Sequence, residues 1–197
     1  MGVSARGRCR IMLLVALSLA LCSAARAQET TVVFDPGRTT IQFTVDSTLH
    51  LVHGTFRLKS GEIHFDSSTG EARGEIRVDA GSGDTENSGR DKKMHNEILE
   101  SPKYPDVVFS PTYVKGPMPA QGTSQVDVEG IFRLHGQDHA MTLTFAVERL
   151  GNGDVQVMTH FAVPYIKWGL KNPSAFVLRV NDTVNVEIHA TGHVQIQ

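Results

Sequence analysis

Residues 124–150 read SQVDVEGIFRLHGQDHAMTLTFAVERL, and this stretch decides the class of fold. Apolar and polar side chains alternate over residues 124–135 and again over residues 139–150, with Gly136-Gln137-Asp138 between the two runs. Alternation with a period of two is typical of a strand with one buried face, and a short glycine-containing link favours a hairpin. We therefore predict two long antiparallel strands here.

The same alternation recurs along most of the chain after residue 28. Apolar side chains take every second position around residues 41–45, 63–65, 76–78, 155–163 and 184–188. Turn-forming residues separate these runs, among them Pro36-Gly37, Lys59-Ser60-Gly61, Ser68-Thr69-Gly70 and Gly151-Asn152-Gly153. We predict eight or more antiparallel strands, joined up and down within a single domain of residues 28–197.

Strand length favours a closed sheet over an open one. Runs of about ten to twelve residues exceed the five or six that are usual for strands. We predict an all-β fold, an elongated antiparallel up-and-down β-barrel of eight strands or slightly more. A barrel of about eight strands either fills itself with side chains or holds one ligand, and a solid-core sandwich remains the alternative.

One segment departs from the strand pattern. Met94 and Ile98 lie four residues apart, which is helical spacing. Ser88 and Asp91 resemble a helix start, and Pro102 follows the expected end. We predict one short helix near residues 88–99, packed on the sheet or over one end of the barrel.

The first 27 residues have the composition of a secretory signal peptide. Arg6, Arg8 and Arg10 precede an apolar run, which ends before Ala25-Arg26-Ala27. The apolar run is too short to span a bilayer as a helix. We expect cleavage after Ala27 and a periplasmic or secreted protein. Lipidation of Cys22 is the alternative, although Leu21 is larger than the residue that such sites usually have.

Charge and cysteine content narrow the choice of partners. The chain has a net charge of −2, and without the four arginines of the leader 15 basic residues face 21 acidic ones, a net charge of −6. Such a balance argues against nucleic acid as a partner. Both cysteines, Cys9 and Cys22, lie in the leader, so no disulfide is expected in the exported domain.

No catalytic motif is found in the sequence. All nine histidines follow the leader, but strand spacing separates most of them. His135 and His139 flank a turn, and as cross-strand neighbours they would form the one plausible metal pair, with an ordinary exposed hairpin pair as the alternative. We predict no catalytic residue, no metal site and no cofactor.

An uncharged set of inward positions suggests either a core or a tunnel for a hydrocarbon chain. Apolar burial contributes about 0.8 kcal/mol per CH₂ group and needs few placed polar groups. We predict as tunnel-lining residues Phe43, Val45, Phe56, Phe109, Phe132, Leu134, Phe145 and Phe161.

The chain contains Thr85-Glu86-Asn87-Ser88-Gly89-Arg90-Asp91 followed by Tyr104-Pro105-Asp106-Val107-Val108-Phe109, and also Phe34-Asp35-Pro36 and residues 130–136. These segments resemble the YceI-like family of exported, lipocalin-shaped proteins associated with polyisoprenoid binding. The first pair of segments is the most specific match. Tyr165-Ile166-Lys167-Trp168-Gly169-Leu170 departs from the family by lacking an acidic residue, as expected of a mouth loop tuned to another ligand.

The resemblance implies a carrier of an isoprenoid-type amphiphile, a polyprenol or a quinone, with no transmembrane span. For the mouth of the tunnel we predict Asn87, Arg90, Asp91, Tyr165 and Trp168. The first three are expected mainly to cap the helix, with a head-group clamp as the alternative. Two other functions stay open, an interaction module with a filled barrel and an enzyme using His135/His139 or Arg90-Asp91. A homodimer is possible.

Overall fold

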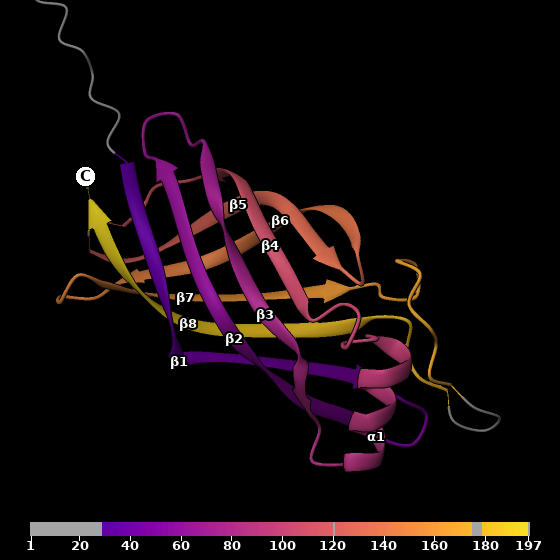
Figure 1. The fold of residues 1–197 in the computed structure, drawn as a ribbon. Coiled ribbons are helices and arrows are strands. Elements are labelled where there is room, and N and C mark those ends of the chain that lie inside the picture. Colours follow the sequence, from indigo (N-terminus) through magenta and orange to yellow (C-terminus); the bar gives the residue numbers. More distant parts are fainter. Residues whose placement is uncertain (1–28, 120, 175–178, 197) are drawn as a thin grey trace, which may run out of the picture.

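A computed structural model describes residues 29–119, 121–174 and 179–196. The predicted leader, residues 1–27, lies outside this part. Eight strands follow one another in chain order around a closed antiparallel barrel, and the last pairs with the first to complete the ring (Figure 1). The barrel prediction is confirmed and the sandwich alternative is wrong. Among the described residues, no helix has both the length and the apolar character needed to cross a bilayer.

The strands are long, as the alternation predicts. Their bounds are β1 Glu29–Asp46, β2 Leu51–Asp66, β3 Ala72–Asp84, β4 Asp106–Lys115, β5 Gly122–Leu134, β6 Gln137–Arg149, β7 Asp154–Val163 and β8 Val184–Ile196. β1 has 18 residues, and at about 3.3 Å per residue such strands make an elongated sheet.

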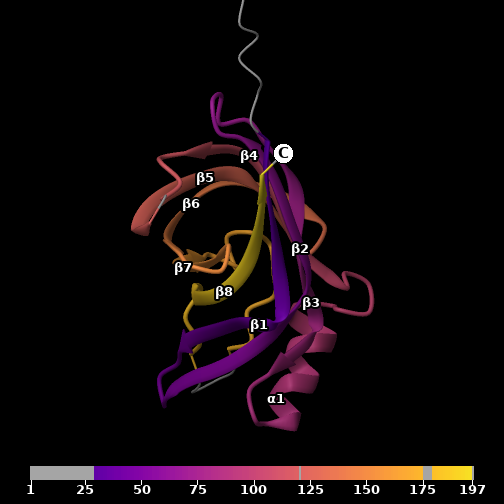
Figure 2. The same ribbon diagram turned by 90° about the vertical axis from the view of Figure 1, so that its left-hand side faces the viewer.

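β1 bends sharply near its middle (Figures 1 and 2). Its pairing with β2 breaks between Val33 and Ile41, and Asp35-Pro36-Gly37 occupies the break. Proline has no N–H to donate to a neighbouring strand, while Asp35 Oδ1 accepts a hydrogen bond from the Gly37 N–H at 2.8 Å. The prediction that Pro36-Gly37 links two strands is wrong. Lys59-Ser60-Gly61 likewise lies within β2, beside a register shift.

The hairpin between β5 and β6 has a tighter turn than predicted. Leu134 pairs with Gln137, so the turn consists of His135 and Gly136. Both residues have positive φ, 52° and 75°, which is the backbone of the two-residue hairpin turns that match strand twist. His139 therefore pairs with Phe132. The prediction that His135 and His139 are cross-strand neighbours is wrong.

The predicted helix begins at Ser88, as expected. α1, Ser88–Lys93, continues directly into a single π-helical turn, η1, Met94–Ile98. The Leu99 N–H donates to the Met94 carbonyl at 2.8 Å, five residues back, which defines that turn. Both segments contact β3, and the helix lies at one end of the barrel (Figure 2).

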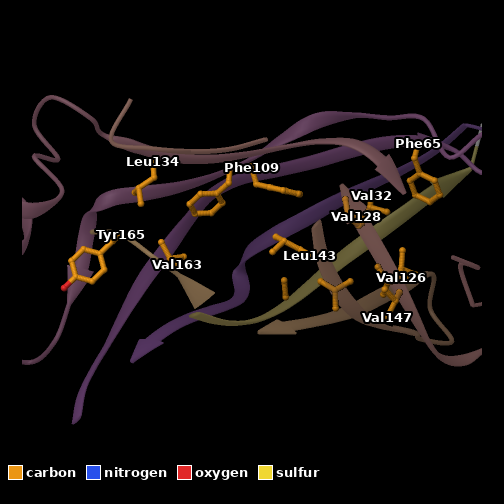
Figure 3. Close-up of a cluster of buried hydrophobic side chains, with 14 of the residues drawn as sticks. Val32, Phe65, Phe109, Val126, Val128, Leu134, Leu143, Val147, Val163 and Tyr165 are labelled. Atoms are coloured by element: carbon orange, nitrogen blue, oxygen red, sulfur yellow. The ribbon is translucent and has the colours of Figure 1, made fainter. Parts of the chain in front are cut away.

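Apolar side chains from the inner face of the barrel pack into one core cluster. Figure 3 shows the cluster extending along the barrel from Leu134 and Tyr165 to Phe65. Val155 in this cluster is fully buried. Because β5 and β6 contribute alternate residues, their inward faces are apolar over most of their length.

Candidate functional site: the barrel interior and its α1 end

Residues 164–174, which follow β7, cover the end of the barrel beside α1. Two contacts tie this cover to the helical segment. Lys93 Nζ donates to the Pro173 carbonyl at 3.2 Å, and Lys171 Nζ lies 3.0 Å from Glu97 Oε2. The cover and the helix therefore close the same end of the barrel.

Four rings gather at this end of the barrel. The indole of Trp168 lies parallel to the imidazole of His139, with ring centroids 3.9 Å apart and planes inclined by 8°. The Phe132 ring lies 5.7 Å from Trp168 and 6.0 Å from Phe161. Trp168, predicted at the mouth, is thus in contact with Phe132 of the predicted tunnel set.

The predicted tunnel residues fall into two groups. Five belong to the core cluster or pack against it: Phe109, Phe132, Leu134, Phe145 and Phe161. Phe43 and Phe56 form a separate ring pair 5.1 Å apart. Val45 pairs with Val52 beside them. Whether a ligand touches either group stays a prediction.

The rings of Phe43 and Phe56 occupy space that is free only because Gly54 and Gly83 have no side chain. A Cβ atom at Gly54 would overlap the Phe43 ring, and one at Gly83 would meet both Phe56 and the Met94 methyl group at 2.6–2.7 Å. This second ring pair therefore packs towards the helical segment through Met94.

Asn87, Arg90 and Asp91 have the capping geometry expected of them. Asn87 Oδ1 accepts a hydrogen bond from the Arg90 N–H at 3.0 Å. Asp91 Oδ1 accepts from both the Thr85 N–H at 3.0 Å and the Thr85 hydroxyl at 2.6 Å, and Arg90 Nε donates to that hydroxyl at 2.7 Å. A role for these three residues in binding a head group stays a prediction.

Tyr165 is buried and ties the cover to the residues just before β8. Its hydroxyl donates to the Asn181 carbonyl at 2.7 Å. Burial, together with the nearby charge of Asp182, raises the pKa of Tyr165 to about 12, so the phenol stays protonated and remains a donor at neutral pH.

His135 and His139 have separate surroundings. His135 Nε2 lies 2.6 Å from Glu100 Oε2, and its ring is 4.3 Å from that of Tyr104. His139 is stacked on Trp168 inside the barrel. Within the described ranges, no three His, Cys, Asp or Glu side chains gather as metal ligands.

A hollow of about 500 Å³ in the barrel wall was not predicted from the sequence. It lies where β1 parts from β2, and its lining includes Phe34, Pro36, Gly61 and Gly74 together with Lys59, Glu62, Glu75 and Arg77. The sequence feature that could have indicated this hollow is Asp35-Pro36-Gly37, where the pairing of β1 with β2 is interrupted.

Solved structures share this fold. A polyisoprenoid binding domain from Saccharophagus degradans, implicated in plant cell wall breakdown, is 14% identical with a TM-score of 0.62, over 84% of this chain and 98% of that one. BcnA from Burkholderia cenocepacia is 14% identical with a TM-score of 0.64, over 80% and 98%. The Campylobacter jejuni YceI protein is 18% identical with a TM-score of 0.51, over 71% and 84%.

No curated protein matches the sequence. The family described as the YceI-like domain matches residues 33–192, which include all eight strands in whole or in part, α1 and the segment that covers the α1 end. The chain belongs to the YceI-like family.

Proposed function

We propose that this protein is a carrier that holds an isoprenoid-type amphiphile, a polyprenol or a quinone, inside its barrel. One observation carries the proposal: the inner face of a closed barrel is apolar over most of its length, and its α1 end is covered. A long hydrocarbon chain needs such a lining, because each buried CH₂ group contributes about 0.8 kcal/mol without a polar partner. The description of the Saccharophagus degradans relative as a polyisoprenoid binding domain supports this ligand class.

The proposal includes an exported location and no chemistry on the ligand. The composition of residues 1–27 supports export to the periplasm or the medium. Arg90 and Asp91 hydrogen-bond within the helix cap, which favours a structural role for them over a catalytic one.

A filled barrel acting as an interaction module is the second candidate. The observation in its favour is that inward side chains such as Phe132, Phe161 and Trp168 already contact one another. A carrier with this structure must move some of these side chains when it loads a chain.

Native mass spectrometry of the purified protein, before and after extraction with organic solvent, separates the two candidates. A carrier is expected to show a noncovalent adduct whose mass fits an isoprenoid alcohol or quinone, and to lose it on extraction. An extracted protein that neither carries such an adduct nor takes up an added polyprenol would contradict the carrier function.

A further inference from the structure

His139 has an unusual position for an ionisable side chain. It shares the inward face of β6 with Met141, Leu143 and Phe145, and it lies opposite Phe132 on β5. Its Nε2 atom is buried and has no hydrogen-bond partner among the described residues. Leaving a buried polar atom without a hydrogen-bond partner destabilises the folded protein, so this nitrogen calls for an explanation.

The surroundings of the imidazole are aromatic. Trp168 covers one face of the ring at 3.9 Å, and Phe132 lies next to both side chains. A trapped water needs two to four polar partners, and the faces of these rings do not provide them. A ligand oxygen held in place by its own hydrocarbon chain does not need further partners.

We propose that His139 Nε2 is the hydrogen-bonding anchor for an uncharged oxygen, a hydroxyl or a carbonyl, at the polar end of an isoprenoid chain, with Trp168 stacked above it as the cover. This inference rests on the proposed carrier function and adds the position and chemistry of the head group. The hydrocarbon chain then extends from the α1 end along the core cluster, whose inward residues are apolar.

The arginines at this end favour a neutral head group over a diphosphate. A diphosphate needs several cationic or N–H donors around it. Arg133 forms a two-contact ion pair with Asp138, at 2.6 and 3.0 Å, and both side chains are exposed. Arg90 already donates to the Thr85 hydroxyl and carbonyl at 2.7 and 2.9 Å. Neither arginine is available at His139.

The chain contains one tryptophan, so emission from Trp168 reports directly on this site. The experiment titrates the extracted protein with geranylgeraniol, with the C20 hydrocarbon that lacks its hydroxyl, and with geranylgeranyl diphosphate. Wild type is expected to bind the alcohol about 3- to 10-fold more tightly than the hydrocarbon, the range of one net hydrogen bond, and more tightly than the diphosphate.

His139→Phe is expected to bind alcohol and hydrocarbon equally, whereas His139→Gln, which keeps an N–H donor, retains part of the preference. His160→Gln, on the exposed face of the neighbouring strand β7, is the matched control and keeps the full preference. The wild-type comparison and His139→Gln carry the test even if His139→Phe folds poorly.

Equal binding of alcohol and hydrocarbon by wild type, a preference that survives in His139→Phe, or tighter binding of the diphosphate would overturn the anchor and leave the carrier function standing. Binding of none of the three probes would overturn both.

Discussion

Arg38 and Asp154 join two strands that are not neighbours in the barrel. The Arg38 guanidinium, beside the bend in β1, donates to Asp154 Oδ2 at the start of β7 over 2.8 Å. His193 on β8 lies 3.1 Å from the other oxygen of the same carboxylate, and the Asn152 side chain adds a third contact at 3.0 Å. Asp154 therefore ties together β1, β7 and β8 at the place where the ring closes.

This cluster predicts loss of stability in acid. The hydrogen bond from Arg38, followed by those from His193 and Asn152, lowers the pKa of Asp154 to about 2, whereas an unfolded Asp titrates near 3.9. Asp154 is therefore protonated at a lower pH in the folded state than in the unfolded state. The stabilisation is fully present above about pH 4 and is lost as the pH falls towards 2.

Urea unfolding at pH 5.5 and pH 3 measures the effect. Wild type should lose more stability over this interval than Asp154→Asn, while Asp127→Asn, outside the cluster, should behave like wild type. An equal loss in wild type and Asp154→Asn would show that Asp154 is not the group responsible.

The cap of α1 depends on Asp91. Asp91→Ala removes the acceptor of both the Thr85 N–H and the Thr85 hydroxyl, and Thr85 is buried. We expect a loss of about 1–2 kcal/mol in the free energy of unfolding. Lys92→Ala, exposed on the same helix, is the control and should change little. If Asp91→Asn kept full thermal stability but lost its ligand, the capping role would be wrong and a head-group clamp would replace it.

Gly74, which lines the hollow in the wall, has no room for a side chain. Its φ is +119°, and an added Cβ would overlap the Glu62 carbonyl on β2. Gly74→Ala is expected to cost about 1–3 kcal/mol, the usual range for strained backbone. Gly81→Ala, in the same strand and without a positive φ, should be nearly neutral in thermal unfolding. Similar melting temperatures for the two variants would contradict this account of the β2–β3 pairing.

The fold was predictable because alternation with a period of two recurs in most of the strands, and a shift of one residue in the pairing would exchange the buried and exposed side chains. The turn between β5 and β6 was not, because His135 adopts a positive φ, which is uncommon outside glycine. Because the turn consists of His135 and Gly136, His139 lies opposite Phe132 and away from His135.

The bend at Asp35-Pro36-Gly37 was not predictable from the sequence either, because these residue types are equally typical of a loop between two strands. No periodic pattern in the sequence predicts the contact between Trp168 and His139. It depends on how the segment after β7 folds back over the barrel, and only the tertiary structure supplies that.

The central claim is that a hydrocarbon chain lies inside the barrel, and neighbouring residues of β7 test it most directly. Val157 points inward and is buried, whereas Met158 points outward and is 46% exposed. The measurement is the affinity for geranylgeraniol, followed by Trp168 emission, of Val157→Phe and Met158→Phe. We predict that Val157→Phe weakens binding at least about 10-fold, the equivalent of about 1.4 kcal/mol, and that Met158→Phe binds like wild type, with both variants folded. Equal affinities of Val157→Phe and wild type would contradict a ligand in the barrel interior.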